Sequence, residues 1–104
     1  MAFHVVTRAG ASIPNPSPEV IDRVLAELDE PLDPEHPDVS LTHDSEWSLG
    51  AFPSGLVIWE NLEHGQPMHM RTVSRDHIRR MWLSLAEGDL DVVQSEPWLE
   101  GYGQ

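Results

Sequence analysis

The six histidines have the widest chemical repertoire in this chain, because imidazole can ligate a metal or act as a general base near neutral pH. None of them belongs to the H-E-x-x-H pattern of a helical zinc site, and the chain has no cysteine that would complete a mixed site. Ser48, Ser54, Ser74 and Ser84 lie outside any G-x-S-x-G nucleophile elbow, and Ser54 fits a P-S-G turn. We therefore expect no metal, no cofactor and no catalytic residue.

Two pairs of carboxylates stand next to tryptophans. Asp44 and Glu46 precede Trp47, and Glu60 and Glu63 follow Trp59. Acids beside an indole ring are typical of sugar sites, but in so acidic a chain we favour a solvated charged rim as the interpretation. They also suit a basic protein partner, because the ring supplies desolvated contact area and the carboxylates accept paired hydrogen bonds from arginine. Nothing in this pattern singles out an enzyme, and we predict that the protein is not one.

The charge balance defines the class of partner. The chain carries 18 acids against six bases, all of them arginine, for a net charge of −12. Such a surface repels nucleic acid and anionic membranes and attracts basic proteins. We predict a binding site for a basic partner at Asp44, Glu46, Trp47, Glu60 and Glu63. Three further acids, Asp33, Glu35 and Asp38, are expected to steer that partner toward the site.

The elements that position these residues begin with a candidate strand over residues 2–7, followed by a proline-rich loop from Ile13. Ser17 is placed as the N-cap and Pro18 as the first residue of a helix with an apolar face, which Pro31 stops. Alternating and apolar runs then predict an antiparallel meander over residues 38–73, with residues 56–59 at the sheet centre.

The last third of the chain predicts a second helix over residues 74–86 with Gly88 as its C-cap. Residues 89–93 are expected to form a short edge strand, and a tail over 97–104 to dock through its aromatic rings. The predicted fold class is α+β: an antiparallel sheet of four to five strands with two helices packed on one face. All 104 residues fit a single domain.

Three arginines on the second helix form a small basic patch, at positions 75, 79 and 80. We expect acids of the same molecule to pair with them, with Glu87 or the acidic loop as candidates. Contact with an acidic patch on a second copy, in a homodimer, is the alternative. The chain starts without a signal-peptide pattern and has no apolar run long enough for a membrane span, so we expect a cytoplasmic protein.

Three stretches carry a resemblance to a known family. They are Trp47–Phe52 leading into S-G-L-V-I-W-E-N (54–61), the helix S-R-D-H-I-R-R-M-W-L-S-L-A-E-G-D (74–89), and E-P-W (96–98). This set resembles the Imm1 family of immunity proteins from bacterial polymorphic toxin systems, over roughly residues 38–100. The chain departs from the family in having D-L-D-V-V-Q-S between Gly88 and Trp98, where a proline is expected soon after the glycine.

The resemblance implies a small acidic domain that binds and neutralises a secreted toxin domain, often a nuclease or deaminase, inside the producing cell. It carries over no catalytic residue. Two alternatives remain open from the residues themselves. One is a small-ligand or carbohydrate-binding domain that uses Trp47 and Trp59, and the other is a structural assembly subunit that pairs through the helix over residues 74–86.

Overall fold

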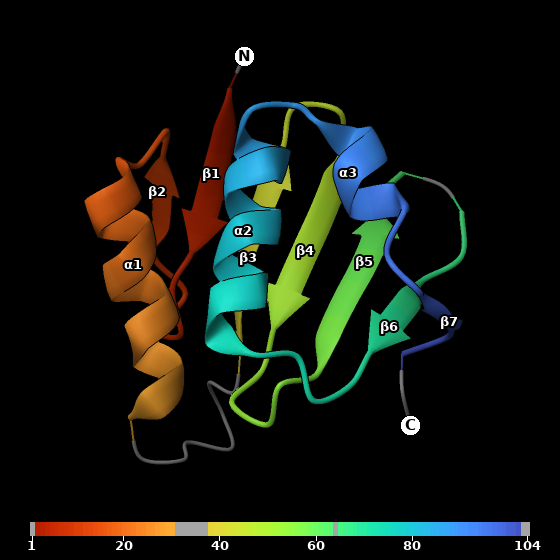
Figure 1. Ribbon diagram of the computed structural model, residues 1–104. Coiled ribbons are helices and arrows are strands. Elements are labelled where there is room, and N and C mark those ends of the chain that lie inside the picture. Colours follow the sequence, from red (N-terminus) through yellow and green to blue (C-terminus); the bar gives the residue numbers. More distant parts are fainter. Residues whose placement is uncertain (1, 31–37, 64, 103–104) are drawn as a thin grey trace.

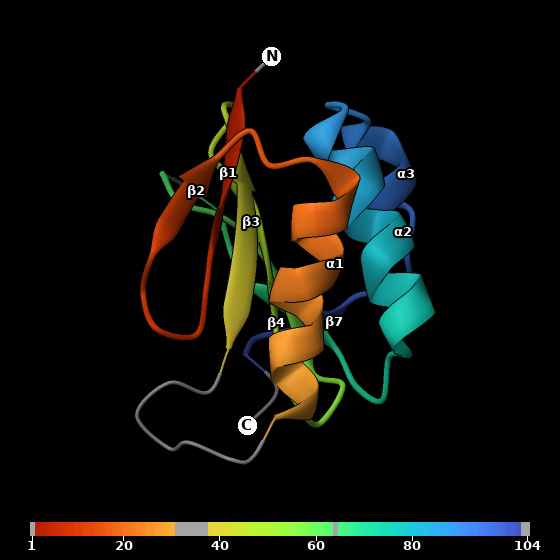
Figure 2. The same cartoon turned by 90° about the vertical axis from the view of Figure 1, so that its left-hand side faces the viewer.

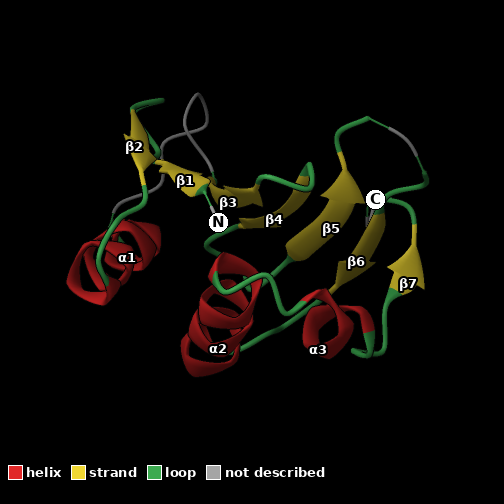
Figure 3. Ribbon diagram, turned by 90° about the horizontal axis from the view of Figure 1, so that it is seen from above, coloured by secondary structure: helices red, strands yellow, loops and turns green. Residues whose placement is uncertain are grey.

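A computed structural model describes residues 2–30, 38–63 and 65–102 of the chain. Over these ranges one antiparallel sheet of seven strands, in the order β2-β1-β3-β4-β5-β6-β7, carries three helices on one face (Figures 1 and 3). The elements are β1 (Phe3–Val6), β2 (Ser12–Pro14), α1 (Pro18–Ala26), the 3-10 turn η1 (Glu27–Asp29), β3 (Val39–His43), β4 (Trp47–Ala51), β5 (Val57–Asn61), β6 (Met68–Met70), α2 (Arg75–Ala86), α3 (Leu90–Gln94) and β7 (Leu99–Glu100). The predicted α+β class is therefore confirmed, with a larger sheet and one more helix than expected.

The two extra strands lie at the sheet edges, which is why local sequence patterns missed them. β2 falls in the proline-rich segment that was predicted as a loop, and it pairs with β1. Pro14 is tolerated there because an edge strand leaves one row of backbone donors without a sheet partner. β7 has only two residues and pairs with β6, which places the end of the described chain against the opposite edge.

Helix ends follow the predicted chemistry. The Ser17 hydroxyl accepts a hydrogen bond from the Val20 amide, and Pro18 is the first helical residue of α1. Ser74 caps α2 in the same way through the His77 amide. Gly88 has a φ of 79°, the left-handed conformation that ends a helix, just after α2.

The edge strand predicted over residues 89–93 is wrong, because this segment forms helix α3. The two adjacent valines favour a strand when the sequence is considered alone. Gly88 instead reverses the chain after α2, and a short helix then buries Val93 completely beneath the sheet. Tertiary packing has overridden a local preference here.

The core fills the space between the sheet and the helices (Figure 2). The register aligns Val5, Leu41, Leu49 and Trp59 in one row that faces the helices. The apolar stripe of α2 packs onto them and is fully or almost fully buried; it consists of Ile78, Met81, Trp82 and Leu85. The Trp82 indole also donates a hydrogen bond to the Leu49 carbonyl at 3.1 Å. The strands of the meander and the helix α2 thus pack through the apolar faces that their sequence periodicities predict.

Two ion pairs connect α2 to the first helical segment. Arg79 Nε lies 2.6 Å from Asp22 Oδ1, and Arg75 Nη2 lies 3.2 Å from Asp29 Oδ1. Pairing within the molecule is therefore confirmed for these two arginines, although the acids come from α1 and η1 instead of Glu87 or the acidic loop. No helix in the described part of the chain is long and apolar enough to cross a membrane.

Candidate functional site

Three of the predicted site residues lie at one end of the sheet. Asp44 and Glu46 belong to the turn between β3 and β4, and Glu63 follows β5. The turn is held against the end of β5, because the Leu62 amide donates to the Glu46 carbonyl at 2.9 Å. Residue Glu46 adopts a positive φ of 72°, which lets the three-residue turn close. Three of the predicted acids therefore lie at the same end of the sheet.

The other predicted acids are spread more widely. Asp38 immediately precedes β3, so five residues of strand separate it from the turn that holds Asp44. Glu60 lies on β5. Asp33 and Glu35, predicted as steering charges, lie outside the described residues.

Trp47 and Trp59 lie on the helix side of the sheet, away from Glu60. The two indole rings stack with their centroids 4.5 Å apart, and Trp98 covers the other side of Trp59 at 6.0 Å. Trp59 is fully buried and donates its indole hydrogen to Gln94 Oε1 at 3.0 Å. Trp59 therefore offers no free ring face to a sugar, and the tryptophan stack is part of the packing between β5 and the C-terminal segment.

The opposite face of the sheet is covered by none of the described helices (Figures 2 and 3). Successive residues of a strand point to opposite faces, so the register identifies the side chains on this open face. They form two rows: Val6, Ser40, Gly50, Ile58 and His69 in one, and His4, Thr42, Ser48 and Glu60 in the next. The middle strands β3 and β4 thus carry the smallest side chains.

This difference in size creates a trough of about 400 Å³ on the open face. Ser40, Thr42, Ser48 and Gly50 form its floor, where the Thr42 hydroxyl donates to the Ser48 hydroxyl at 3.0 Å. Larger side chains of β1 and β5 flank the floor. Asp38 and Phe52 lie at one end of the trough, and Leu62 lies at the other. The flanking residues are His4, Val6, Ile58, Glu60 and Tyr102. Binding sites for ligands are concave in most proteins, and this trough combines a polar floor with apolar side chains such as Val6, Ile58 and Leu62.

The electrostatics of the trough are negative. It contains the carboxylates of Asp38 and Glu60, and none of its lining residues in the described chain is an arginine. Burial raises the pKa of the Asp38 carboxyl, an effect partly offset by a hydrogen bond from its own backbone. Glu60 Oε2 accepts a hydrogen bond from the Tyr102 hydroxyl at 2.8 Å, and this bond with the nearby charge raises the pKa of Tyr102. The arrangement favours a cationic occupant.

A second hollow continues the trough toward the acidic end of the sheet. Its volume is about 270 Å³, and it shares His4, Thr42 and Leu62 with the lining of the trough. Asp44 and Glu46 line its far side. Four of the predicted acids, Asp38, Glu60, Asp44 and Glu46, therefore lie along one continuous surface. Trp47 does not line this surface.

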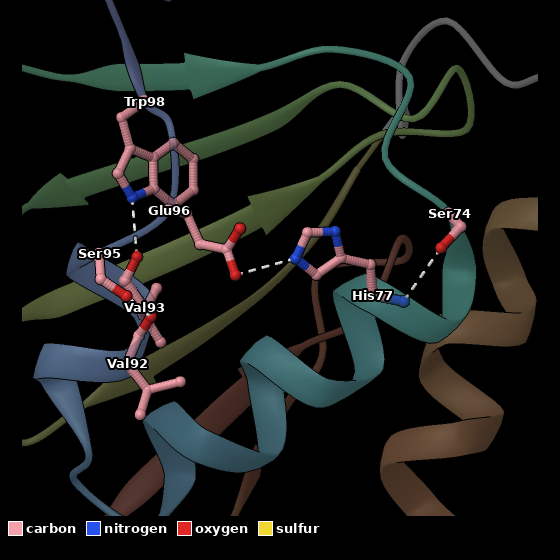
Figure 4. A network of polar contacts seen from close by, with 7 residues as sticks. All are labelled: Ser74, His77, Val92, Val93, Ser95, Glu96 and Trp98. Atoms are coloured by element: carbon pink, nitrogen blue, oxygen red, sulfur yellow. Dashed lines mark hydrogen bonds and ion pairs between the residues drawn. The ribbon is translucent and has the colours of Figure 1, made fainter.

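The C-terminal segment, residues 95–102, crosses the sheet edge to reach the trough. His77 Nε2 lies 2.9 Å from Glu96 Oε2, and the Trp98 indole donates to the Val93 carbonyl at 2.8 Å (Figure 4). β7 then pairs with β6, and Tyr102 comes to lie on the open face beside Glu60. The docking predicted for the tail is confirmed for its described part, and it places an aromatic ring at the trough.

Sequence reasoning missed most of the residues that shape the trough. The alternation in residues 38–44 does mark Ser40 and Thr42 as facing away from the core, and this was the available signal. Gly50 and Ile58 gave no such signal, because their position beside Ser40 follows from the register. Among the described residues, no three histidine, aspartate or glutamate side chains gather closely enough to hold a metal ion.

Comparisons with known proteins return no matching family model, no matching curated protein and no matching solved structure.

Proposed function

We propose that this domain is a non-catalytic binding protein that uses its open sheet face to occupy a basic surface of a partner protein. The observation that carries the proposal is the trough: a concavity of mixed polar and apolar lining that contains the carboxylates of Asp38 and Glu60 and no arginine in its described lining. The acidic turn at Asp44 and Glu46 extends the same negative surface. Opposite charge on the partner would steer the encounter and suppress wrong partners.

The specific role that we propose is that of an immunity-type inhibitor acting in the cytoplasm against a secreted toxin domain of the nuclease or deaminase type. Enzymes that act on nucleic acid bind their polyanionic substrate through basic surfaces, which an acidic protein can occupy in its place. The resemblance of residues 38–100 to the Imm1 family supports this role, and the net charge of −12 is compatible with it.

The experiment begins with capture of partners by the tagged protein at low salt, followed by elution at high salt and mass spectrometry. Each captured protein is then produced alone and together with this domain in a heterologous host. We expect one basic protein that is toxic alone and harmless when co-produced. A set of captured proteins that show neither toxicity nor protection would refute the inhibitor role.

Charge variants then test which face binds. Glu60→Gln removes one negative charge from the trough, whereas Glu87→Gln removes one from the end of α2, outside the trough. We expect the first variant to weaken binding to the partner far more than the second. Equal effects would mean that only net charge matters, and an association rate that ignores salt would exclude electrostatic steering.

A second candidate function is the binding of a small cationic ligand. The trough volume of about 400 Å³ favours it, because sites for small molecules have volumes of about 300–1,000 Å³. This form of the ligand-binding alternative no longer uses Trp47 and Trp59. The assembly alternative loses its apolar contact, since the apolar stripe of α2 is buried within the monomer.

A further inference from the structure

The contact between Tyr102 and Glu60 joins two residues far apart in the chain at the edge of the trough. The hydroxyl donates to Glu60 Oε2 at 2.8 Å, while the tyrosine side of the contact remains about half exposed. A hydrogen bond this exposed can be replaced by another donor that reaches the carboxylate. It occupies a lone pair of the Glu60 carboxylate, which lines the trough.

The surroundings of Glu60 suit the guanidinium group of an arginine better than other cations. Arginine has a planar head that bonds carboxylates through two parallel N–H groups and stacks on aromatic rings, and it has an apolar stem. Glu60 supplies the carboxylate, the Tyr102 ring lies beside it, and Ile58 with Leu62 supplies apolar surface for the stem. The small floor of Ser48 and Gly50 leaves the depth that such a side chain needs.

We propose that the trough binds an arginine side chain on an extended basic segment of the partner, and that its guanidinium displaces the Tyr102 hydroxyl from Glu60. Tyr102 is thus an internal competitor for the site and also the ring on which the bound guanidinium stacks. This inference rests on the proposed function, because it names the chemical group of the partner that the open face recognises.

The second carboxylate of the trough sets a spacing for the segment. The backbone of Asp38 lies two strands away from that of Glu60 and about four residues along the strand direction, which corresponds to roughly 16 Å at ~3.3 Å per residue and ~4.8 Å between strands. The Asp38 carboxylate reaches back toward Gly50, so the two carboxylates are closer together than their backbones. Two cations four residues apart in an extended chain are separated by about 13 Å, which suits this shorter span. The favoured ligand is therefore a segment that carries two arginines at this separation.

Tyr102 is the only tyrosine of the chain, so its titration reports on this one site. The probe is the acetylated and amidated peptide Arg-Gly-Ser-Gly-Arg, with the same peptide carrying citrulline in place of both arginines as a neutral control. Ultraviolet absorbance follows tyrosinate formation in the whole protein. We expect the arginine peptide to lower the raised pKa of Tyr102, because the bond to Glu60 is lost and a cation arrives. The citrulline peptide should leave it unchanged.

Affinity measurements at neutral pH supply the second readout. Tyr102→Phe keeps the ring and removes the competing hydroxyl, so the peptide should bind about fivefold more tightly. Glu60→Gln should weaken binding about tenfold or more, because it removes the charge of the acceptor. Glu100→Gln is the matched control: it removes one charge from the same C-terminal segment outside the trough lining, and binding should change less than about twofold.

Several outcomes would overturn the proposal. The first is that the arginine and citrulline peptides bind equally well. The second is that the arginine peptide leaves the pKa of Tyr102 unchanged. The third is that Tyr102→Phe binds the arginine peptide no more tightly than the wild type does. These outcomes are separate from failure of the proposed function. If a basic partner binds normally to Tyr102→Phe and Glu60→Gln, the proposed function holds and this arginine site is excluded. If the peptide binds as expected but no basic partner is found, the arginine site holds and the proposed function is excluded.

Discussion

Gly50 allows the trough to be closed without damage to the fold. It lies in the middle of β4, between Ser40 and Ile58 on the neighbouring strands. A Cβ built on Gly50 has its nearest contacts at 3.9 Å, with Asp38 Oδ2 and the Val39 carbonyl, which is ordinary van der Waals distance. Its φ is not in the left-handed region, so the backbone conformation does not require a glycine. We predict that Gly50→Val fills the floor of the trough and leaves the sheet intact.

The expected change in stability is a gain. Glycine inside a strand is destabilising by roughly 0.5–1 kcal/mol relative to alanine, because it loses more backbone freedom on folding. Valine adds a preference for strands on a scale that spans ~1 kcal/mol, and it packs beside Ile58. Together these effects predict about 1 kcal/mol of added stability, which raises the melting temperature of a domain this size by about 4–8 °C. Gly50→Ala should show about half of the gain.

Binding should change in the opposite direction. The valine methyl groups project into the floor between the walls of β1 and β5, where the arginine stem is proposed to lie. Affinity for the arginine peptide should fall by about tenfold, which corresponds to ~1.4 kcal/mol. Thermal or urea unfolding gives the first quantity and calorimetric titration the second, on the same sample. A stable variant with unchanged peptide affinity would show that the trough is not the site.

Gly55 provides the matched control for the stability argument. Its φ is +90°, and an added Cβ would lie 3.0–3.1 Å from backbone atoms of Thr72 and Val73. Gly55→Ala should therefore cost about 2 kcal/mol or more, from the left-handed backbone and the close contacts together. If Gly50→Ala and Gly55→Ala change stability by similar amounts, the reasoning from local space and backbone conformation is wrong.

Two further substitutions test the charge of the trough and the core beneath it. Burial raises the pKa of Asp38, so folding disfavours its ionised form and stability is lost as the pH rises from about 3.8 through the raised value. The free energy of unfolding of Asp38→Asn, relative to that of the wild type, should therefore increase between about pH 3 and pH 7. The increase should be larger than that of the Glu87→Gln control. A difference that does not vary with pH in urea unfolding would contradict this. Trp82→Phe removes core volume and the buried hydrogen bond to the Leu49 carbonyl. It should lower the free energy of unfolding by about 2–3 kcal/mol in the same assay. A loss under ~1 kcal/mol would mean that the sheet and α2 repack freely.

The helix ends and the central strands were predictable because their signals lie within a few residues of each other. Ser17 with Pro18 and Ser74 with Gly88 mark the ends of two helices through capping chemistry that needs no distant partner. The alternation in residues 38–44 likewise separated Val39 and Leu41, which are buried against the helices, from Ser40. By contrast, the edge strands and α3 depend on what lies beside them, and their sequences misled or said nothing.

The site shows the same division. Sequence alone carries the prediction of a cationic partner, because net charge depends on composition and not on the fold. It also grouped Asp44, Glu46 and Glu60 in one predicted site. Which face each side chain occupies was decided by strand register, since a shift of one residue moves every side chain to the other side of the sheet. That is why Trp47 and Glu60, which were predicted to share one site, lie on opposite faces, and why Tyr102 meets Glu60 across 42 residues of chain.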